Sequence, residues 1–153
     1  MFPYVQLDVK ELLTYDEATA GGLMTTEYIP VREEMTAQQV IDLLREMAPE
    51  AETVYYVYVT DEDERMVGVI SLRDLIISPA DKRVRDFMVS NVIHVHLDAD
   101  IEEIAQTMER YNLLALPVVD EENHIQGIVT VDDTLEQVLP EEWKRRVPKL
   151  WSR

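Results

Sequence analysis

Two short segments of the chain carry a hydroxyl and a carboxylate at the same spacing. Residues 68–74 read GVISLRD and residues 127–133 read GIVTVDD. The matched polar residues are Ser71 with Thr130, and Asp74 with Asp133. A hydroxyl that ends a strand and a carboxylate in the first turn of the next helix share one rim of a cleft, beside free N–H groups of the helix. This spacing predicts a nucleotide site, in which the hydroxyl contacts phosphate and the carboxylate accepts hydrogen bonds from ribose hydroxyls.

The same residues also have a purely structural interpretation. In a ligand site, Gly68 and Gly127 would let a ligand or another backbone come close. In the structural interpretation, Asp74, Asp132 and Asp133 cap short helices and the two glycines relieve crowding. A single copy of the phrase would favour this interpretation. Two copies, at equivalent places of a repeat, favour a ligand site.

An internal repeat determines where these residues lie. Residues 23–31 (LMTTEYIPV) align with residues 87–95 (FMVSNVIHV), 64 positions further along the chain. The two phrases that contain the hydroxyl and the carboxylate are 59 positions apart, because the first copy has five extra residues near 48–53. Internal repetition of this kind indicates two copies of one supersecondary unit.

Each copy contains the same succession of expected elements. A short strand precedes a segment of helical periodicity, over residues 36–47 and 98–111, for which Thr36 and Asp98 are the expected N-caps. An apolar strand, an acidic turn, a second strand and a short helix follow. Each copy therefore reads β-α-β-β-α.

One such unit is too small to cover its own sheet, so we expect an α/β fold in which two repeats pack through their sheets as a pseudo-twofold pair. The expected divisions are a lead-in over residues 1–19, repeat 1 over 20–80, repeat 2 over 81–139 and a basic tail with two tryptophans over 140–153. The tail either packs on the acidic body or docks on a partner or membrane surface. No apolar run is long enough for a transmembrane segment.

Charge is the strongest feature of the composition. The chain has 31 acidic and 14 basic residues, a net charge of −17 and no cysteine. Such a surface repels nucleic acid and attracts cations, so we expect divalent cations where acidic surfaces meet and no nucleic acid partner. The lack of cysteine excludes thiolate nucleophiles and fits a reducing cytoplasm.

Residues suited to catalysis are few. His94 and His96 alternate on an expected strand without an evident third metal ligand, and His124 falls in an expected turn. No serine or threonine has a histidine at a recognisable spacing, and no phosphate-binding Walker loop is present. We therefore expect a protein that is not an enzyme.

Several phrases, taken as a set, resemble a known family. They are TAGGLMTTEYIPV, APEAETVYYVYVTDE, GVISLRDLI, LLALPVVDEE and GIVTVDD. With the repeated β-α-β-β-α order, the chain resembles a tandem pair of cystathionine-β-synthase (CBS) domains, the Bateman module, over about residues 20–138. More narrowly, it is similar to the cytosolic CBS pair of MgtE-type magnesium transporters.

This resemblance implies an adenine nucleotide such as ATP in the cleft. Arg73 and Asp74 would meet the sugar and phosphates, Tyr56 would lie against the adenine, and Leu116 and Pro117 would line its other side. The alternation in VYYVYV also allows Tyr56 to be a core or interface residue.

The resemblance also implies Mg²⁺ bound at acidic surfaces between modules. Asp100, Glu102 and Asp133 match the positions that help to hold the ion, and carboxylates suit it chemically. Asp133 is thereby assigned both to ribose and to metal. Asn112 stands where the family commonly has an aspartate.

The expected function is that of a cytoplasmic regulatory module that senses adenine nucleotide and magnesium. CBS pairs resemble one another in forming flat dimers, so a homodimer is expected, and the output would pass to a transporter or to a domain outside these residues. The alternative is a cation-dependent homodimerisation module with no nucleotide ligand.

Overall fold

The computed structural model describes residues 19–47 and 54–138. The expected N-terminal lead-in, the extra residues near 48–53 and the basic tail lie almost wholly outside the described residues. The elements of the first half are α2 (Ala20–Leu23), β1 (Pro30–Val31), α3 (Ala37–Met47), β2 (Tyr56–Thr60), β3 (Met66–Ser71) and α4 (Leu72–Ile77). Those of the second half are the 3₁₀ turn η3 (Val84–Asp86), β4 (Val95–His96), α5 (Ile101–Tyr111), β5 (Ala115–Val119), β6 (Ile125–Thr130) and α6 (Val131–Val138).

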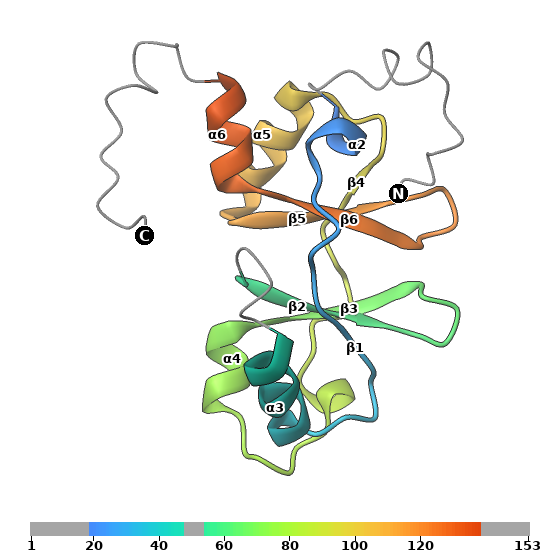
Figure 1. The fold of residues 1–153 in the computed structure, drawn as a ribbon, viewed down its shortest axis with the longest axis vertical. Coiled ribbons are helices and arrows are strands. Elements are labelled where there is room, and N and C mark those ends of the chain that lie inside the picture. Colours follow the sequence, from blue (N-terminus) through green and yellow to red (C-terminus); the bar gives the residue numbers. More distant parts are fainter. Residues whose placement is uncertain (1–18, 48–53, 139–153) are drawn as a thin grey trace.

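The two halves have the same topology. Each holds a three-stranded sheet, in the order β1-β2-β3 or β4-β5-β6, whose first pair is parallel and whose second pair is antiparallel. Both central strands have a register irregularity at the same place, before Thr60 and before Val119. The two sheets face each other, and the helices cover their outer sides (Figure 1). The predicted α/β pair of repeats is therefore confirmed.

Local sequence explains where the long helices begin and end. Thr36 and Gln39 exchange side-chain hydrogen bonds with each other's backbone N–H, a capping box that starts α3. Asp100 caps α5 by accepting a hydrogen bond from the Glu103 N–H at 2.8 Å. Asn112, with φ of 53°, ends α5 in the left-handed conformation. The prediction that Asp98 is the cap was wrong, since α5 begins two residues later.

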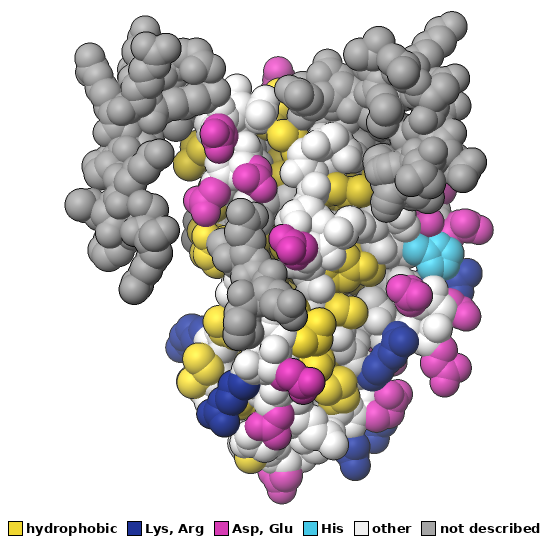
Figure 2. Space-filling model, viewed as in Figure 1, with side chains coloured by type: hydrophobic (Ala, Val, Ile, Leu, Met, Phe, Trp, Pro, Cys, Tyr) yellow, Lys and Arg dark blue, Asp and Glu magenta, His cyan; other side chains and the backbone are white. Residues whose placement is uncertain are grey.

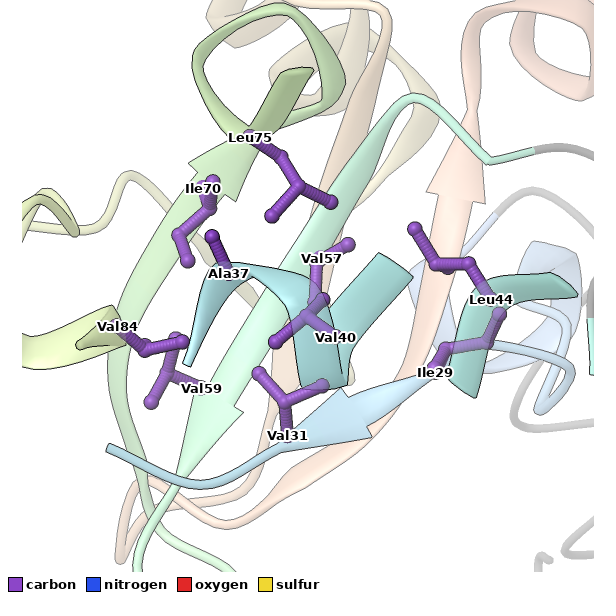
Figure 3. Packing of buried hydrophobic residues seen from close by; sticks show 10 residues of the cluster. All are labelled: Ile29, Val31, Ala37, Val40, Leu44, Val57, Val59, Ile70, Leu75 and Val84. Atoms are coloured by element: carbon purple, nitrogen blue, oxygen red, sulfur yellow. The ribbon is translucent and has the colours of Figure 1, made fainter. Parts of the chain in front are cut away.

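Each repeat has its own hydrophobic core between sheet and helices. In the first, Val40 and Leu44 of α3 pack on Val57 and Val59 of β2 (Figure 3). The side chains of these helix residues recur at a four-residue spacing, which places them on one face. A third cluster fills the space between the sheets and includes Tyr58, Ile125 and Ile128. This third cluster is the shared core expected for a pseudo-twofold pair.

The first segment of each repeat packs on the other repeat. The N–H of Ala20 in α2 donates to Ala99 O at 2.8 Å, and Ala20 belongs to the second core. Likewise the N–H of Val84 in η3 donates to Met35 O at 2.8 Å, and Val84 belongs to the first core. The lead-in segments of the two repeats are residues 20–29, before β1, and residues 84–94, before β4. Figure 1 shows these segments, in blue and yellow, running from one half to the other. The repeats are therefore interlocked.

The tips of the two strand hairpins also meet. The N–H of Met66 donates to Asn123 O at 3.0 Å, and the N–H of Ile125 donates to Glu64 O at 3.4 Å. Glu64 and Asn123 occupy equivalent turn positions with φ of 66° and 68°. The contact therefore obeys the same pseudo-twofold relation as the sheets.

The charged side chains are distributed unevenly. Figure 2 shows acidic side chains over both halves of one face, whereas basic ones lie mainly on the half that holds α3 and α4. Residues 95–138 contain eleven acidic residues and one basic residue, Arg110. In the described residues no helix is both long and apolar enough to cross a membrane.

Candidate functional site

A cavity of about 220 Å³ lies between the two sheets. Repeat 1 contributes side chains from β2, β3 and α4: Tyr56, Tyr58, Val69, Ser71 and Asp74. The second lead-in and the start of β5 contribute the opposite wall: Val89, Asn91, Val92, Ile93, Leu113, Ala115 and Pro117. The walls are therefore mostly apolar, with the polar groups of the repeated phrase at one end.

Ser71 and Asp74 meet at the junction between β3 and α4. Ser71 ends the strand, and its hydroxyl oxygen accepts a hydrogen bond from the Asp74 N–H at 3.1 Å. The serine thus caps the helix, yet its own O–H remains able to donate. The Asp74 carboxylate lies 3.5 Å from the Arg73 guanidinium, and the Arg73 side chain is 80% exposed. An ion pair this exposed contributes little to stability and leaves both groups able to contact a ligand.

The structure brings together part of the predicted nucleotide set. Tyr56, Ser71, Asp74 and Pro117 line the cavity, and Arg73 stands beside its rim. Leu116 was expected to line the cleft beside Pro117, but its side chain is fully buried in the second core and lies outside the cavity wall. Neighbouring side chains of a strand point to opposite faces, so Leu116 and Pro117 cannot both face the cleft.

Tyr56 serves two purposes. Its ring lines the cavity, while its hydroxyl oxygen accepts a hydrogen bond from the Leu114 N–H at 3.1 Å. Leu114 directly precedes β5, so this bond joins the two repeats at the cleft. Tyr56 is therefore a cavity residue and an interface residue at the same time.

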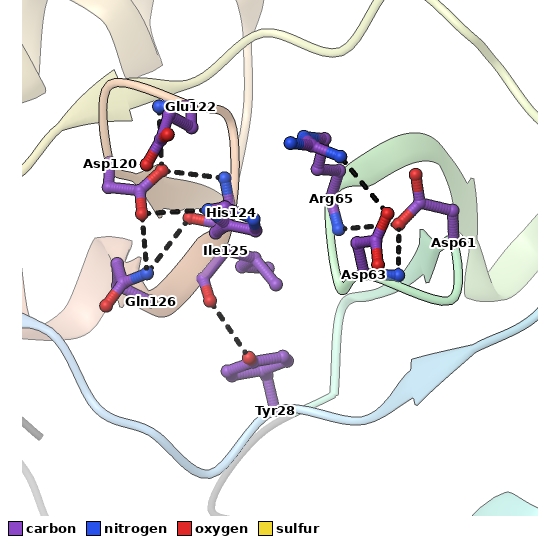
Figure 4. A network of polar contacts seen from close by, with 9 residues as sticks. All are labelled: Tyr28, Asp61, Asp63, Arg65, Asp120, Glu122, His124, Ile125 and Gln126. Carbon is purple, nitrogen blue, oxygen red and sulfur yellow. Dashed lines mark hydrogen bonds and ion pairs between the residues drawn. The ribbon is translucent and has the colours of Figure 1, made fainter.

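The second copy of the phrase repeats the local geometry but lines none of the three cavities described for the chain. The Thr130 hydroxyl oxygen accepts a hydrogen bond from the Asp133 N–H at 3.3 Å, and Thr130 is buried. The residues that correspond to Asn91 and Val92 of the first cleft are Glu27 and Tyr28. The Tyr28 hydroxyl donates to Ile125 O at 3.4 Å and its ring packs on the cluster between the sheets (Figure 4).

The two glycines of the phrase make room for the lead-in segments. A Cβ at Gly68 would stand 2.5 Å from the Met88 sulfur, and one at Gly127 would stand 2.7 Å from Thr25 O. Met88 and Thr25 belong to the exchanged lead-ins, which pair with β3 and β6 at these points. A close backbone, as expected, accounts for Gly127, whereas a close side chain accounts for Gly68.

Sequence reasoning missed the role of Tyr58. This residue lines the cavity, is 1% exposed and has a hydroxyl without a hydrogen-bond partner in the described part of the chain. Burial raises the pKa of Tyr58, with a smaller contribution from Tyr56, so the hydroxyl keeps its proton. The alternation in VYYVYV places Tyr56 and Tyr58 on one face and was the available signal.

The residues predicted to hold metal do not gather within one chain. Asp100 caps α5, Glu102 lies in its first turn and Asp133 lies in the first turn of α6. Within residues 19–47 and 54–138, the one group of three His, Asp or Glu ligand atoms that are close enough for a metal is Asp120, Glu122 and His124. Asp100, Glu102 and Asp133 therefore form no such group among the described residues.

The group at Asp120 is a turn held by its own hydrogen bonds (Figure 4). The Asp120 carboxylate accepts from the Glu122 N–H and the His124 N–H, and lies 3.0 Å from the His124 ring nitrogen. Burial raises the pKa of Asp120, but these hydrogen bonds outweigh it and leave the pKa below its ordinary value. Asp61 of the first hairpin makes the same turn, and backbone hydrogen bonds from Arg65 and Asp63 lower its pKa.

Comparisons with known proteins agree with this geometry. The magnesium transporter MgtE of Thermus thermophilus is 49% identical over 97% of this chain, and that of Enterococcus faecalis is 45% identical over 86%. The chain spans 33% and 29% of those two transporters, so it corresponds to about a third of their length.

Solved structures give the same result. The cytosolic domain of the Mg²⁺ channel MgtE in complex with ATP superimposes with a TM-score of 0.80 at 50% identity, covering 89% of this chain and 55% of that one. The soluble part of a magnesium transporter gives a TM-score of 0.79 at 45% identity, covering 85% and 51%. A CBS-domain profile matches residues 20–81 and again residues 84–139. The chain therefore belongs to the CBS-domain family, as a tandem pair similar to the cytosolic domain of MgtE magnesium transporters.

Proposed function

We propose that the chain is a non-catalytic regulatory module, on the cytoplasmic side of a magnesium transporter of the MgtE type, that binds an adenine nucleotide between its repeats. The observation that carries this proposal is the cavity between the two sheets, with Ser71 and Asp74 at its rim. Support comes from a relative at 50% identity that was solved in complex with ATP.

The residues at the rim suit the sugar and the phosphates. The Asp74 carboxylate accepts hydrogen bonds from two ribose hydroxyls, while Ser71 donates its O–H to a phosphate oxygen. Arg73 supplies the positive charge, and its exposed side chain is free to turn from Asp74 toward the phosphates. The apolar walls beyond Tyr56 and Pro117 hold the base. Because the cavity of about 220 Å³ is smaller than pockets for whole drug-sized ligands, which are about 300–1,000 Å³, the phosphates extend along the open rim.

Regulation follows from the composition of the walls. The cavity takes side chains from both repeats, and Tyr56 joins them by its bond to Leu114. A nucleotide therefore binds with different affinity to arrangements of the repeats that differ at this seam, and it shifts the population toward the arrangement it prefers. The transporter to which the module is attached senses that shift.

A homodimer is part of the proposal. Four apolar side chains are exposed on the short helices that end the repeats: Ile76 and Ile77 of α4, and Leu135 and Val138 of α6. Figure 1 shows α4 and α6 along the same edge of the pair. An apolar edge of this kind is suited to an isologous contact between two copies.

We expect Mg²⁺ to bind at such a contact. Asp133 lies on α6, and Asp100 and Glu102 lie at the start of α5, which packs on α6. A second copy brings further carboxylates toward these three, and Mg²⁺ offsets the repulsion between the surfaces.

The alternative function is a cation-dependent assembly module that takes no nucleotide. The observation that favours it is the charge of residues 95–138, which contain eleven acidic residues and one basic residue. This alternative predicts dimerisation that depends on Mg²⁺ in a chain whose cleft stays empty with every nucleotide offered.

The deciding experiment is isothermal titration calorimetry of ATP into the chain, with and without Mg²⁺. We expect saturable binding that is lost in Asp74→Ala and kept in Asp42→Ala, which removes an exposed carboxylate of α3 that does not line the cavity. Absence of heat with ATP, ADP and AMP, together with a saturable Mg²⁺ titration, would favour the alternative.

A further inference from the structure

The hydroxyl of Tyr58 is the one buried side-chain polar atom without a hydrogen bond in the described residues. The side chain is 1% exposed, so solvent does not reach the oxygen either. A buried hydroxyl with no partner destabilises a fold, whereas a phenylalanine would fill the same space without that cost. Packing alone therefore does not account for a tyrosine here.

Strand register fixes where this hydroxyl group lies relative to the rim of the cleft. Tyr56 pairs with Ser71 across β2 and β3, and Tyr58 pairs with Val69 two residues further in. Alternate residues of a strand share a face, so all four side chains lie on the cleft side of the sheet. The cleft thus runs from Ser71 at the rim to Tyr58 at its inner end.

The inner end offers a ligand little else that is polar. Val69 and Pro117 are apolar neighbours there, and the remaining polar side chains of the cavity stand at the rim or are exposed. A flat heterocycle that entered between the two sheets would have Tyr58 as its polar neighbour at this end. Because burial raises the pKa of Tyr58, the neutral hydroxyl both donates and accepts hydrogen bonds.

We propose that the Tyr58 hydroxyl hydrogen-bonds the polar edge of the nucleotide's base and so determines which base the cleft accepts. This inference rests on the proposed function, since it requires the nucleotide to occupy this cleft. The sugar and phosphates remain at Ser71 and Asp74, while the base displaces the side chains that cover the Tyr58 oxygen and becomes its hydrogen-bond partner.

The test is Tyr58→Phe, with calorimetric affinities for ATP, ADP, AMP and GTP. The variant should bind the three adenine nucleotides about tenfold more weakly or worse, by a common factor, because the hydroxyl contacts the part that they share. The preference for ATP over GTP should shrink by a similar factor. The melting temperature of the unliganded variant should be unchanged or higher, which excludes misfolding as the cause.

The matched control is Tyr28→Phe. Its hydroxyl donates to Ile125 O and does not line the cavity, so affinity for ATP should be unchanged. Equal ATP affinity of wild type and Tyr58→Phe would overturn the inference and leave the proposed function standing. Equal losses for ATP and GTP would also overturn it, since the hydroxyl would then act on the sugar or on packing. A wild-type chain that binds none of the four nucleotides would overturn both.

Discussion

The carbonyl oxygen of Thr25 lies 2.7 Å from the point at which a Cβ would stand on Gly127. Thr25 exchanges two backbone hydrogen bonds with Ile128, at 2.8 and 2.9 Å, so this oxygen is held in place by the pairing itself. At the equivalent Gly68, the nearest atom is the sulfur of Met88, at the far end of a flexible side chain. The nearest neighbour of Gly127 is therefore a fixed backbone atom, whereas that of Gly68 is a flexible side chain.

Alanine substitution should separate these two positions. Gly127→Ala forces the backbone of the lead-in away from β6 and should lower the free energy of unfolding by about 1–3 kcal/mol. Gly68→Ala should cost less, because the Met88 side chain can turn aside. Urea unfolding followed by circular dichroism measures both. A larger loss at Gly68 than at Gly127 would contradict this account of the glycines.

Nucleotide stoichiometry should be one per chain. The first cleft has a measurable cavity, whereas the equivalent of its Asn91 is Glu27, whose charge repels phosphate. Titration calorimetry should give one site for ATP, and Asp133→Ala should retain it while Asp74→Ala loses it. Two sites, with one of them lost in Asp133→Ala, would show that the second phrase also binds nucleotide.

Self-association should depend on the exposed apolar side chains of α4 and α6. Ile76 is 70% exposed, and its equivalent Leu135 is exposed on α6. Analytical ultracentrifugation should show a dimer of the wild type and a monomer of Ile76→Glu or Leu135→Glu, since a charge on each side of an isologous contact repels its copy. Met47→Glu, which alters an exposed apolar residue of α3, is the control and should leave the dimer intact. A monomeric wild type would remove the homodimer from the proposal.

Acid stability should depend on Asp120. Hydrogen bonds hold its pKa below the ordinary value in the folded chain, despite the burial that raises it. A carboxyl of this kind stabilises the fold above its unfolded pKa of about 4, and that contribution is lost as the pH falls through the folded pKa. Below about pH 4, wild type should therefore lose stability more steeply than Asp120→Asn.

Glu121→Gln is the control for that comparison, because Glu121 is an exposed neighbour in the same turn. Thermal melts between pH 7 and pH 3 give the two slopes. Equal slopes for Asp120→Asn and wild type would mean that the hydrogen bonds to Asp120 do not stabilise the fold.

Much of the fold could be predicted because each element carries a local signal. The 64-residue offset of the repeat even locates the helix cap that was missed, since it maps Thr36 onto Asp100. Comparison of the two copies was therefore a stronger guide than either copy alone.

The candidate site was harder to predict because it depends on contacts between distant segments. Alternation along β5 shows that Leu116 and Pro117 face opposite ways, but only the packing of the second core decides which of them faces the cleft. The missing partner of Tyr58 has no trace in sequence either, since it depends on every neighbour of one oxygen atom. Residue types were predictable here, and their environments were not.

The exchange of lead-in segments has a consequence for how the chain is divided. The boundaries of each sequence repeat differ from the boundaries of each folded core. Ala20 of the first repeat completes the second core, and Val84 of the second repeat completes the first core. A single repeat cut out by its sequence boundaries would carry a lead-in with no core to join and a core with no lead-in. Two such fragments can satisfy each other by domain swapping, so half of this chain would be stable only as a pair of copies.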